Sequence, residues 1–245
     1  MDNSNSGIDG VTRIVKDGEG TNSCVSLSDD ILAVKPQDDD TAATFIVYSK
    51  GGTSLFYVDS SSSKVYALDN IVNTQYATFN IPNSETSSFA DDTHQAIPFG
   101  NANYGAATSP PAFGTGTDPA TSFTTAEGNG TRASDIVPVM WYVPDAISID
   151  SVTSLEGADA ATGDTTRMHL FSYTFTSGAT NCLTSGTLLA HNSDVTNAGS
   201  EQPYLSTWTV DSAAVTAGKV ILAFFKSDSI NSDYSLNIKV KYHLT

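Results

Sequence analysis

The residue types that carry most enzyme chemistry are few in this chain and follow no known catalytic spacing. The four histidines, His94, His169, His191 and His243, have no second histidine two or four positions away, as a local metal site would need. No Gly-x-Ser-x-Gly elbow, phosphate-binding glycine loop, His-Glu-x-x-His or Cys-x-x-Cys is present. We therefore predict surface or structural roles for the histidines, with His243 on a solvent-facing strand position, and read the segment 91–94 as a turn that enters a strand.

Carboxylates offer the next most common chemistry. Glycoside hydrolysis needs two carboxylates that face each other across a sugar cleft. The chain has five glutamates, all in predicted turns or loops and with no spacing that pairs two of them: Glu19, Glu85, Glu127, Glu156 and Glu201. We predict that the protein is not an enzyme.

The acidic run Asp38, Asp39 and Asp40 is the best local candidate for a cation, because adjacent carboxylates in a turn can supply oxygen ligands to Ca²⁺. It lacks the glycine and the distal glutamate of an EF-hand loop, so a solvated turn is the alternative. No other cofactor is predicted. Cys24 and Cys182 have no nearby metal ligand and are expected to be free thiols.

Composition and charge narrow the class of protein. Charged residues make up only 16% of the 245 residues, and no stretch has the pattern of a long helix, which indicates an all-β protein. With 11 basic against 27 acidic residues the formal charge is −16. This disfavours nucleic acid as a partner, because phosphate binding needs clustered Lys and Arg. The strand-borne pair Lys239 and Lys241 is the only local basic cluster.

Targeting signals are missing from the sequence. Residues 1–6 contain neither a basic region nor an apolar core of a secretory signal. The longest apolar runs, 136–143 and 220–225, are far shorter than a membrane span. We therefore expect assembly in a cytoplasm without a membrane anchor.

The segment 45–68 has the pattern of a β-meander, with three short apolar runs separated by a Gly-Gly turn and a serine turn. Three strands of this size cannot bury their apolar face alone. We expect that face to contact copies of the same chain. The residues that we assign to this subunit contact are Phe45, Val47, Leu55, Phe56, Val58 and Val65.

The pattern Gly-Gly-x-x-Leu-Phe-x-Val-Asp, followed by a polar turn and another valine, resembles the β-stem repeats of trimeric surface appendages of tailed bacteriophages. The resemblance covers about a tenth of the chain. It implies a homotrimer on the virion surface, assembled in the host bacterial cytoplasm, with other virion proteins such as the major capsid or tail protein as partners.

Three regions are expected along the chain. Residues 1–36 form an extended docking arm with three short strands, for which a flexible tail is the alternative, and residues 37–85 form the stem. Residues 86–245 form an antiparallel jelly-roll sandwich, interrupted by a long loop over residues 100–135. Two aromatic residues of that loop, Phe113 and Phe123, are expected to contact another subunit if the loop is not disordered.

Eight strands are predicted in the sandwich, including one at 136–143. Trp141 and Tyr142 should face opposite sides of that strand, and Trp208 should be buried. Residues 220–225 are apolar at both odd and even positions, which indicates that this strand is buried on both faces. The segments 218–221 and 233–238 look like the closing strands of phage and virus jelly rolls.

These observations lead to one main hypothesis and two alternatives. The main hypothesis is a virion structural protein: a head decoration (cement) protein or a short fibre or knob. The first alternative is a tail-fibre protein or depolymerase domain that binds a host receptor glycan. The second is a non-viral surface or matrix protein, which would be monomeric.

Overall fold

The computed structural model describes residues 8–37, 39–68, 70–84, 90–100, 110–159, 162–199, 201–228 and 233–245. Strands account for 52% of the chain and helices for 3%, which confirms the predicted all-β class. The chain divides into two compact units, Met1–Thr74 and Gln75–Thr245, which we call the N-terminal unit and the sandwich.

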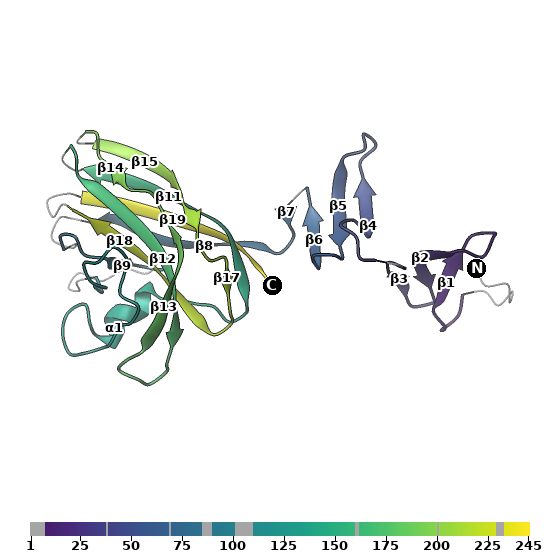
Figure 1. Cartoon of the computed structure of the whole chain (residues 1–245), viewed down its shortest axis with the longest axis horizontal. Coiled ribbons are helices and arrows are strands. Elements are labelled where there is room, and N and C mark those ends of the chain that lie inside the picture. The colour runs from purple at the N-terminus through teal and green to yellow at the C-terminus, as the bar shows by residue number, and fades with distance from the viewer. Residues whose placement is uncertain are drawn as a thin grey trace. The chain divides into compact units, whose positions relative to one another are not determined.

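Two small antiparallel sheets make up the N-terminal unit (Figure 1). The first has the order β1-β2-β3 and the second the order β4-β5-β6-β7. Their strands are β1 (Arg13–Lys16), β2 (Asn22–Leu27), β3 (Leu32–Val34), β4 (Phe45–Tyr48), β5 (Ser54–Asp59), β6 (Lys64–Ala67) and β7 (Asn70–Ile71). The turn between β4 and β5 uses Gly52 at φ +84°, a conformation that favours glycine. None of the described residues of this unit is buried.

The sandwich consists of two antiparallel sheets in a jelly-roll-like arrangement. One sheet has the order β10-β18-β12-β13-β16, with β9 paired to β18 and β14 to β12. The other has the order β15-β11-β19-β8, with β17 paired to β11. The bounds are β8 (Thr74–Ser84), β9 (Gln95–Ile97), α1 (Ala133–Ile136), η1 (Val137–Val139), β10 (Trp141–Tyr142), β11 (Ile147–Asp159), β12 (Thr165–Phe175), β13 (Leu183–His191), β14 (Val195–Thr196), β15 (Glu201–Thr207), β16 (Thr209–Val210), β17 (Ala214–Val215), β18 (Lys219–Ser227) and β19 (Asp233–Leu244).

Alternate residues of β18 supply two separate hydrophobic cores. Ile221, Ala223 and Phe225 belong to the core that also draws on β11 and β19 of the other sheet. Val220, Leu222 and Phe224 point the other way, into a second core that is covered by residues from the segment 112–140. The predicted burial of this strand on both faces is therefore confirmed.

Two predicted elements differ from the structure. The run 136–143 does not form one strand, because a helical turn at α1 and η1 precedes the short strand β10, and Pro138 within η1 has no N–H to donate to a sheet. Trp141 is nonetheless buried and Tyr142 exposed, as predicted. The predicted stem, residues 37–85, includes β8, which pairs with β19 and belongs to the sandwich.

Candidate functional site

Five of the residues predicted to contact other subunits lie on one face of the sheet formed by β4, β5 and β6. The strand register pairs Phe45 with Val58, Val47 with Phe56, and Val58 with Val65. Directly paired residues of an antiparallel sheet point to the same side. Ala67, opposite Phe56, completes a set that we call the apolar face: Phe45, Val47, Phe56, Val58, Val65 and Ala67.

The apolar face is open to solvent in the single chain. Phe45 and Val47 are each 41% exposed and Val65 is 36% exposed, while Phe56 and Val58 are half-buried. The rings of Phe45 and Phe56 contact edge to face, with centroids 6.2 Å apart. No side chain of the face carries a charge. Burying such a surface contributes about 25 cal/mol for each Å² removed from water, so a partner surface here is favoured.

Leu55 lies on the opposite face of the same sheet. It shares that face with Tyr57, whose ring stacks on Tyr66 at a centroid distance of 4.7 Å. Leu55 is 40% exposed but is separated by the sheet from the other five residues that the sequence assigned to the contact.

Phe113 and Phe123 pack inside their own chain. They are 2% and 7% exposed, and their rings stack 4.9 Å apart within the second core of the sandwich. Phe123 N donates to the carbonyl oxygen of Leu183 at 2.9 Å, which holds the segment against β13. The chain itself thus supplies the contacts that the sequence assigned to a neighbouring subunit. Residues 101–109 of the predicted loop lie outside the described residues.

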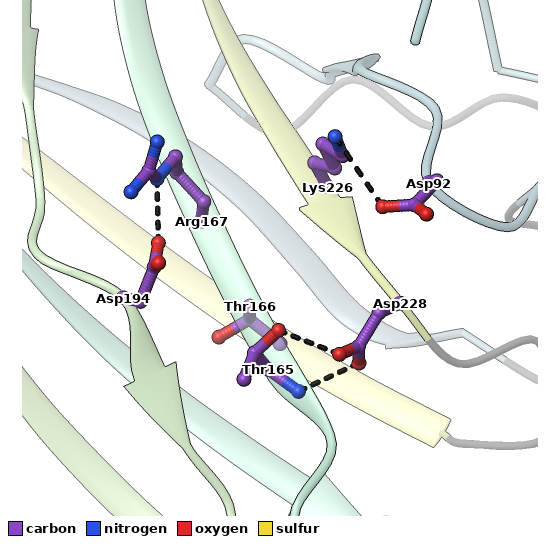
Figure 2. A pocket seen from close by; sticks show the side chains of 7 residues that line it. All are labelled: Asp92, Thr165, Thr166, Arg167, Asp194, Lys226 and Asp228. Atoms are coloured by element: carbon purple, nitrogen blue, oxygen red, sulfur yellow. Dashed lines mark hydrogen bonds and ion pairs between the residues drawn. The ribbon is translucent and has the colours of Figure 1, made fainter. Parts of the chain in front are cut away.

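A polar pocket of about 160 Å³ lies where the start of β12 runs beside the end of β18 (Figure 2). Arg167 Nε contacts Asp194 Oδ1 at 2.5 Å, and Lys226 Nζ lies 3.3 Å from Asp92 Oδ1. The pocket is lined by Asp92, Thr165, Thr166, Arg167, Asp194, Lys226 and Asp228.

Four of the charged groups of this pocket form two ion pairs, and the fifth, Asp228, is held by hydrogen bonds. Figure 2 shows Arg167 turned toward Asp194 and Lys226 toward Asp92. The Asp228 carboxylate accepts hydrogen bonds from Thr165 N at 2.6 Å and Thr165 Oγ1 at 2.7 Å. The volume is below the roughly 300–1,000 Å³ of typical ligand pockets. We interpret the pocket as an ion-pair network that ties strand ends together, and sequence spacing gave no signal for it because its members are far apart in the chain.

Three of the four histidines come together beside this pocket, although the sequence kept them apart. The rings of His94 and His169 lie 4.9 Å apart, and those of His169 and His191 lie 6.4 Å apart. His169 and His191 face each other across β12 and β13, which the alternation of those strands alone could not reveal. His94 and His169 are buried, whereas the predicted surface role fits His191, whose Nδ1 lies 2.8 Å from Asp211 Oδ2.

His243 is buried, which corrects its predicted place on the solvent-facing side of the last strand. Its Nδ1 lies 2.8 Å from Asp150 Oδ1. The register between β11 and β19 shifts between Ile149 and Ser151, so Asp150 is the extra residue of a bulge. Bulges re-aim side chains, and strict alternation in the sequence does not predict them.

Glu156 lies inside β11 and not in the predicted turn. It is 3% exposed, and its two carboxylate oxygens accept hydrogen bonds from Thr166 Oγ1 at 2.8 and 3.0 Å. Burial raises the pKa of Glu156 to about 7, and the Thr166 hydrogen bond opposes that rise. With the side chain closed off from solvent, this carboxyl bears on stability and has no access to a substrate.

The acidic run predicted as a cation site is only partly described by the structure. Asp39 and Asp40 are exposed, and Asp38 lies outside the described residues. Among the described residues, no group of three or more His, Cys, Asp or Glu side chains is placed to hold a metal ion. Cys24 is exposed and Cys182 is buried, and both are free thiols.

Comparisons with known proteins leave the family open: no protein-family model and no curated protein matches this chain. In the part of the chain that the structure describes, none of the helices has the length and apolar character needed to span a membrane.

Proposed function

We propose that the chain is a non-enzymatic structural protein of the surface of a tailed-phage virion, and that it assembles as a homotrimer through the apolar face of the N-terminal unit. One observation carries this proposal. The sheet of β4, β5 and β6 presents six uncharged apolar side chains on one face, in a unit where no described residue is buried. A four-stranded sheet of this size needs another surface to cover its apolar side.

A second and a third copy of the same chain fit this face best. Each chain carries a formal charge of −16, so copies repel one another over most of their surface. The apolar face lacks charge and can meet its own copies without burying like charges. The opposite face carries Asp59 and Lys64 at a paired position and is less suited to self-contact. The resemblance of this segment to trimeric phage stems supports three copies.

The remaining regions then have assembly roles. The sheet of β1 to β3 exposes Leu32 at 66%, and Ile31 just before β3 is 52% exposed; these side chains would suit docking on another virion protein such as the major capsid or tail protein. The sandwich has its own two cores and would form the decoration or knob of each subunit.

Two adjacent residues on opposite faces of β5 provide a matched test. Phe56→Ser places a hydroxyl on the apolar face, whereas Tyr57→Ser changes the other face to a similar extent. Truncating a buried phenylalanine costs about 3–5 kcal/mol per chain. We therefore expect Phe56→Ser to dissociate the trimer at micromolar concentration and Tyr57→Ser to retain it.

Native mass spectrometry of the two variants and of the unmodified chain measures this directly, with circular dichroism as the check that the sandwich remains folded. If both variants keep the trimer, the apolar face is not the interface. If the unmodified chain is a monomer, the assembly role itself fails.

A further inference from the structure

Two buried histidines lie beneath a segment that covers the second core of the sandwich. His94 is 0% and His169 is 2% exposed, and they meet although they come from different elements, just before β9 and within β12. We call residues 112–123 the covering segment, since they include Phe113 and Phe123 of that core. Neither histidine has a role in the assembly proposed above.

The oxygen atoms that face the two rings indicate where the ring protons lie. His94 Nε2 lies 3.1 Å from the carbonyl oxygen of Gly116, and a carbonyl only accepts, so this nitrogen is the donor. His169 Nε2 faces Asp118 Oδ1 at 3.4 Å, so it too carries its proton on Nε2. The Nδ1 atoms of both rings are buried and have no hydrogen-bond partner among the residues that the structure describes. A second proton on either ring would therefore point an N–H at a site without an acceptor.

The charged groups around the rings add to this cost. Arg167 on β12 and Lys226 on β18 oppose a positive charge on His169, and so do the neighbouring His94 and His191. Burial, the largest cause, together with these charges lowers the pKa of His169 to about 3, and burial likewise lowers the pKa of His94.

The carboxylates nearby do not compensate for this repulsion. Asp118 is 58% exposed and its contact with His169 is long, at 3.4 Å. Asp92 pairs with Lys226, and Asp211 pairs with His191.

The same histidines hold the covering segment in place. His94 N donates to the carbonyl oxygen of Gly114 at 2.9 Å, and Phe113 N donates back to the carbonyl oxygen of His94 at 2.7 Å. Lys226 Nζ donates to the carbonyl oxygen of Gly116 at 3.3 Å, beside the bond from His94 Nε2. Displacing the His94 ring thus loosens Gly116, and displacing the His169 ring loosens Asp118.

We propose that His94 and His169 form an acid-sensitive latch, which keeps the covering segment closed at neutral pH and releases it in mild acid. In the closed form both rings stay neutral. In the released form they are hydrated and take up protons near their ordinary pKa of about 6.5. Acid therefore favours release, which exposes Phe113, Phe123 and the second core beneath them.

The expected size follows from proton linkage. With a closed-form pKa of about 3 and a released-form pKa of about 6.5, His169 alone favours release roughly 25-fold more at pH 5 than at pH 7. His94 acts in the same direction, because its pKa is also lowered. Amide hydrogen exchange of peptides from the covering segment, corrected for the intrinsic effect of pH on exchange, measures this opening in the full-length protein.

We expect at least a tenfold rise in opening of the covering segment between pH 7 and pH 5, with peptides from β11 and β19 unchanged. The double variant His94→Gln and His169→Gln keeps an amide donor in each place and cannot titrate, so its opening should change less than threefold. The matched control is His191→Gln, which alters the third histidine, whose Nδ1 lies 2.8 Å from Asp211 Oδ2. This variant removes one of the smaller repulsions on His169 and leaves both latch rings able to titrate, so its opening should still rise at least tenfold in acid.

Equal opening of the unmodified protein at both pH values overturns the latch, and so does a double variant that opens in acid as the unmodified protein does. If the double variant fails to fold, proton NMR of the unmodified protein decides the question. Two histidine ring signals should stay neutral well below pH 6 and change only as the covering segment opens. Four histidines that titrate near pH 6.5 with the segment still protected would overturn the proposal.

Discussion

The N-terminal unit and the sandwich are built from the same kind of strand but differ in how far their apolar side chains are buried. Among the described residues, eleven exposed large hydrophobic side chains belong to the N-terminal unit and seven belong to the much longer sandwich. Every buried residue among those described lies in the sandwich. The pattern of a strand alone therefore does not decide whether its side chains are buried. Burial depends on how many other surfaces pack against that strand.

Strands β5 and β18 make the comparison concrete. Each strand has apolar residues at both odd and even positions, over Leu55–Val58 in β5 and Val220–Phe225 in β18. β18 is covered on one side by the second sheet and on the other by the covering segment. The described residues of the N-terminal unit place no such layer over β5, and the side chains on both of its faces remain partly open to solvent. We infer that the layer missing over β5 is supplied by other chains.

The largest expected effect comes from separating the two units. Residues 75–245 contain both cores and should fold as a monomer with one cooperative transition. Residues 1–74 should lose their β-structure on dilution, because none of their described side chains is buried within the unit. Circular dichroism of each fragment over a dilution series tests this. A 1–74 fragment that stays folded as a monomer would remove the basis of the comparison.

A core truncation in the sandwich should have the next largest effect. Phe224 is 0% exposed and its ring lies 4.7 Å from that of Phe113. Phe224→Ala should lower the free energy of unfolding by about 3–5 kcal/mol. Denaturant unfolding of the 75–245 fragment measures this. The matched change Phe45→Ala, made in the full chain, should leave the sandwich transition in place and act on trimer dissociation; a loss of sandwich stability there would contradict the independence of the units.

The buried carboxyl of Glu156 should make the stability of the sandwich fall as the pH rises toward 7. Its pKa rises from 4.5 to about 7 on folding, so the folded state holds the proton more tightly than the unfolded state does. The contribution of Glu156 to the free energy of unfolding is fully present below pH 4.5 and is lost as the pH rises to about 7.

Glu156→Gln keeps the neutral form at every pH. At pH 8 we expect the variant to be more stable than the unmodified protein by about 2–3 kcal/mol, and at pH 4.5 the two should converge. Denaturant unfolding at both pH values reads out this difference. If the variant is destabilised equally at pH 8 and pH 4.5, the fold already offsets the cost of burying the Glu156 carboxylate.

The smallest effect is expected from an exposed leucine of the sandwich. Leu205 is 72% exposed on β15, more than Phe45, Val47 or Val65 of the apolar face. Leu205→Ser should change stability by no more than about 0.5 kcal/mol and leave the oligomeric mass unchanged. Val47→Ser, at a less exposed position, should weaken the trimer. Equal effects of the two on mass would show that exposure alone, and not membership of the apolar face, governs association.

Strand patterns made much of the fold predictable. The meander at 45–68 and the long closing strand are both present, since hairpin turns and alternation are local properties. The helical turn around Pro138 and the bulge at Asp150 were missed, because each depends on how the surrounding sheet positions the backbone.

The residues of a candidate site were predictable only where they come from consecutive strands of one sheet. Five of the contact residues share a face because β4, β5 and β6 follow one another in the chain. The pair His94 and His169 lies 75 positions apart and meets only through strand pairings that no local spacing encodes. Glu156 was assigned to a turn because Gly157 follows it, yet that glycine lies within β11, opposite Ser235.

The central claim is that the chain completes its N-terminal unit with two further copies of itself. Light scattering of the full-length protein at micromolar concentration tests it most directly. We predict three times the chain mass of 25.7 kDa, stable on dilution. A single-chain mass with the N-terminal strands still formed would contradict the account.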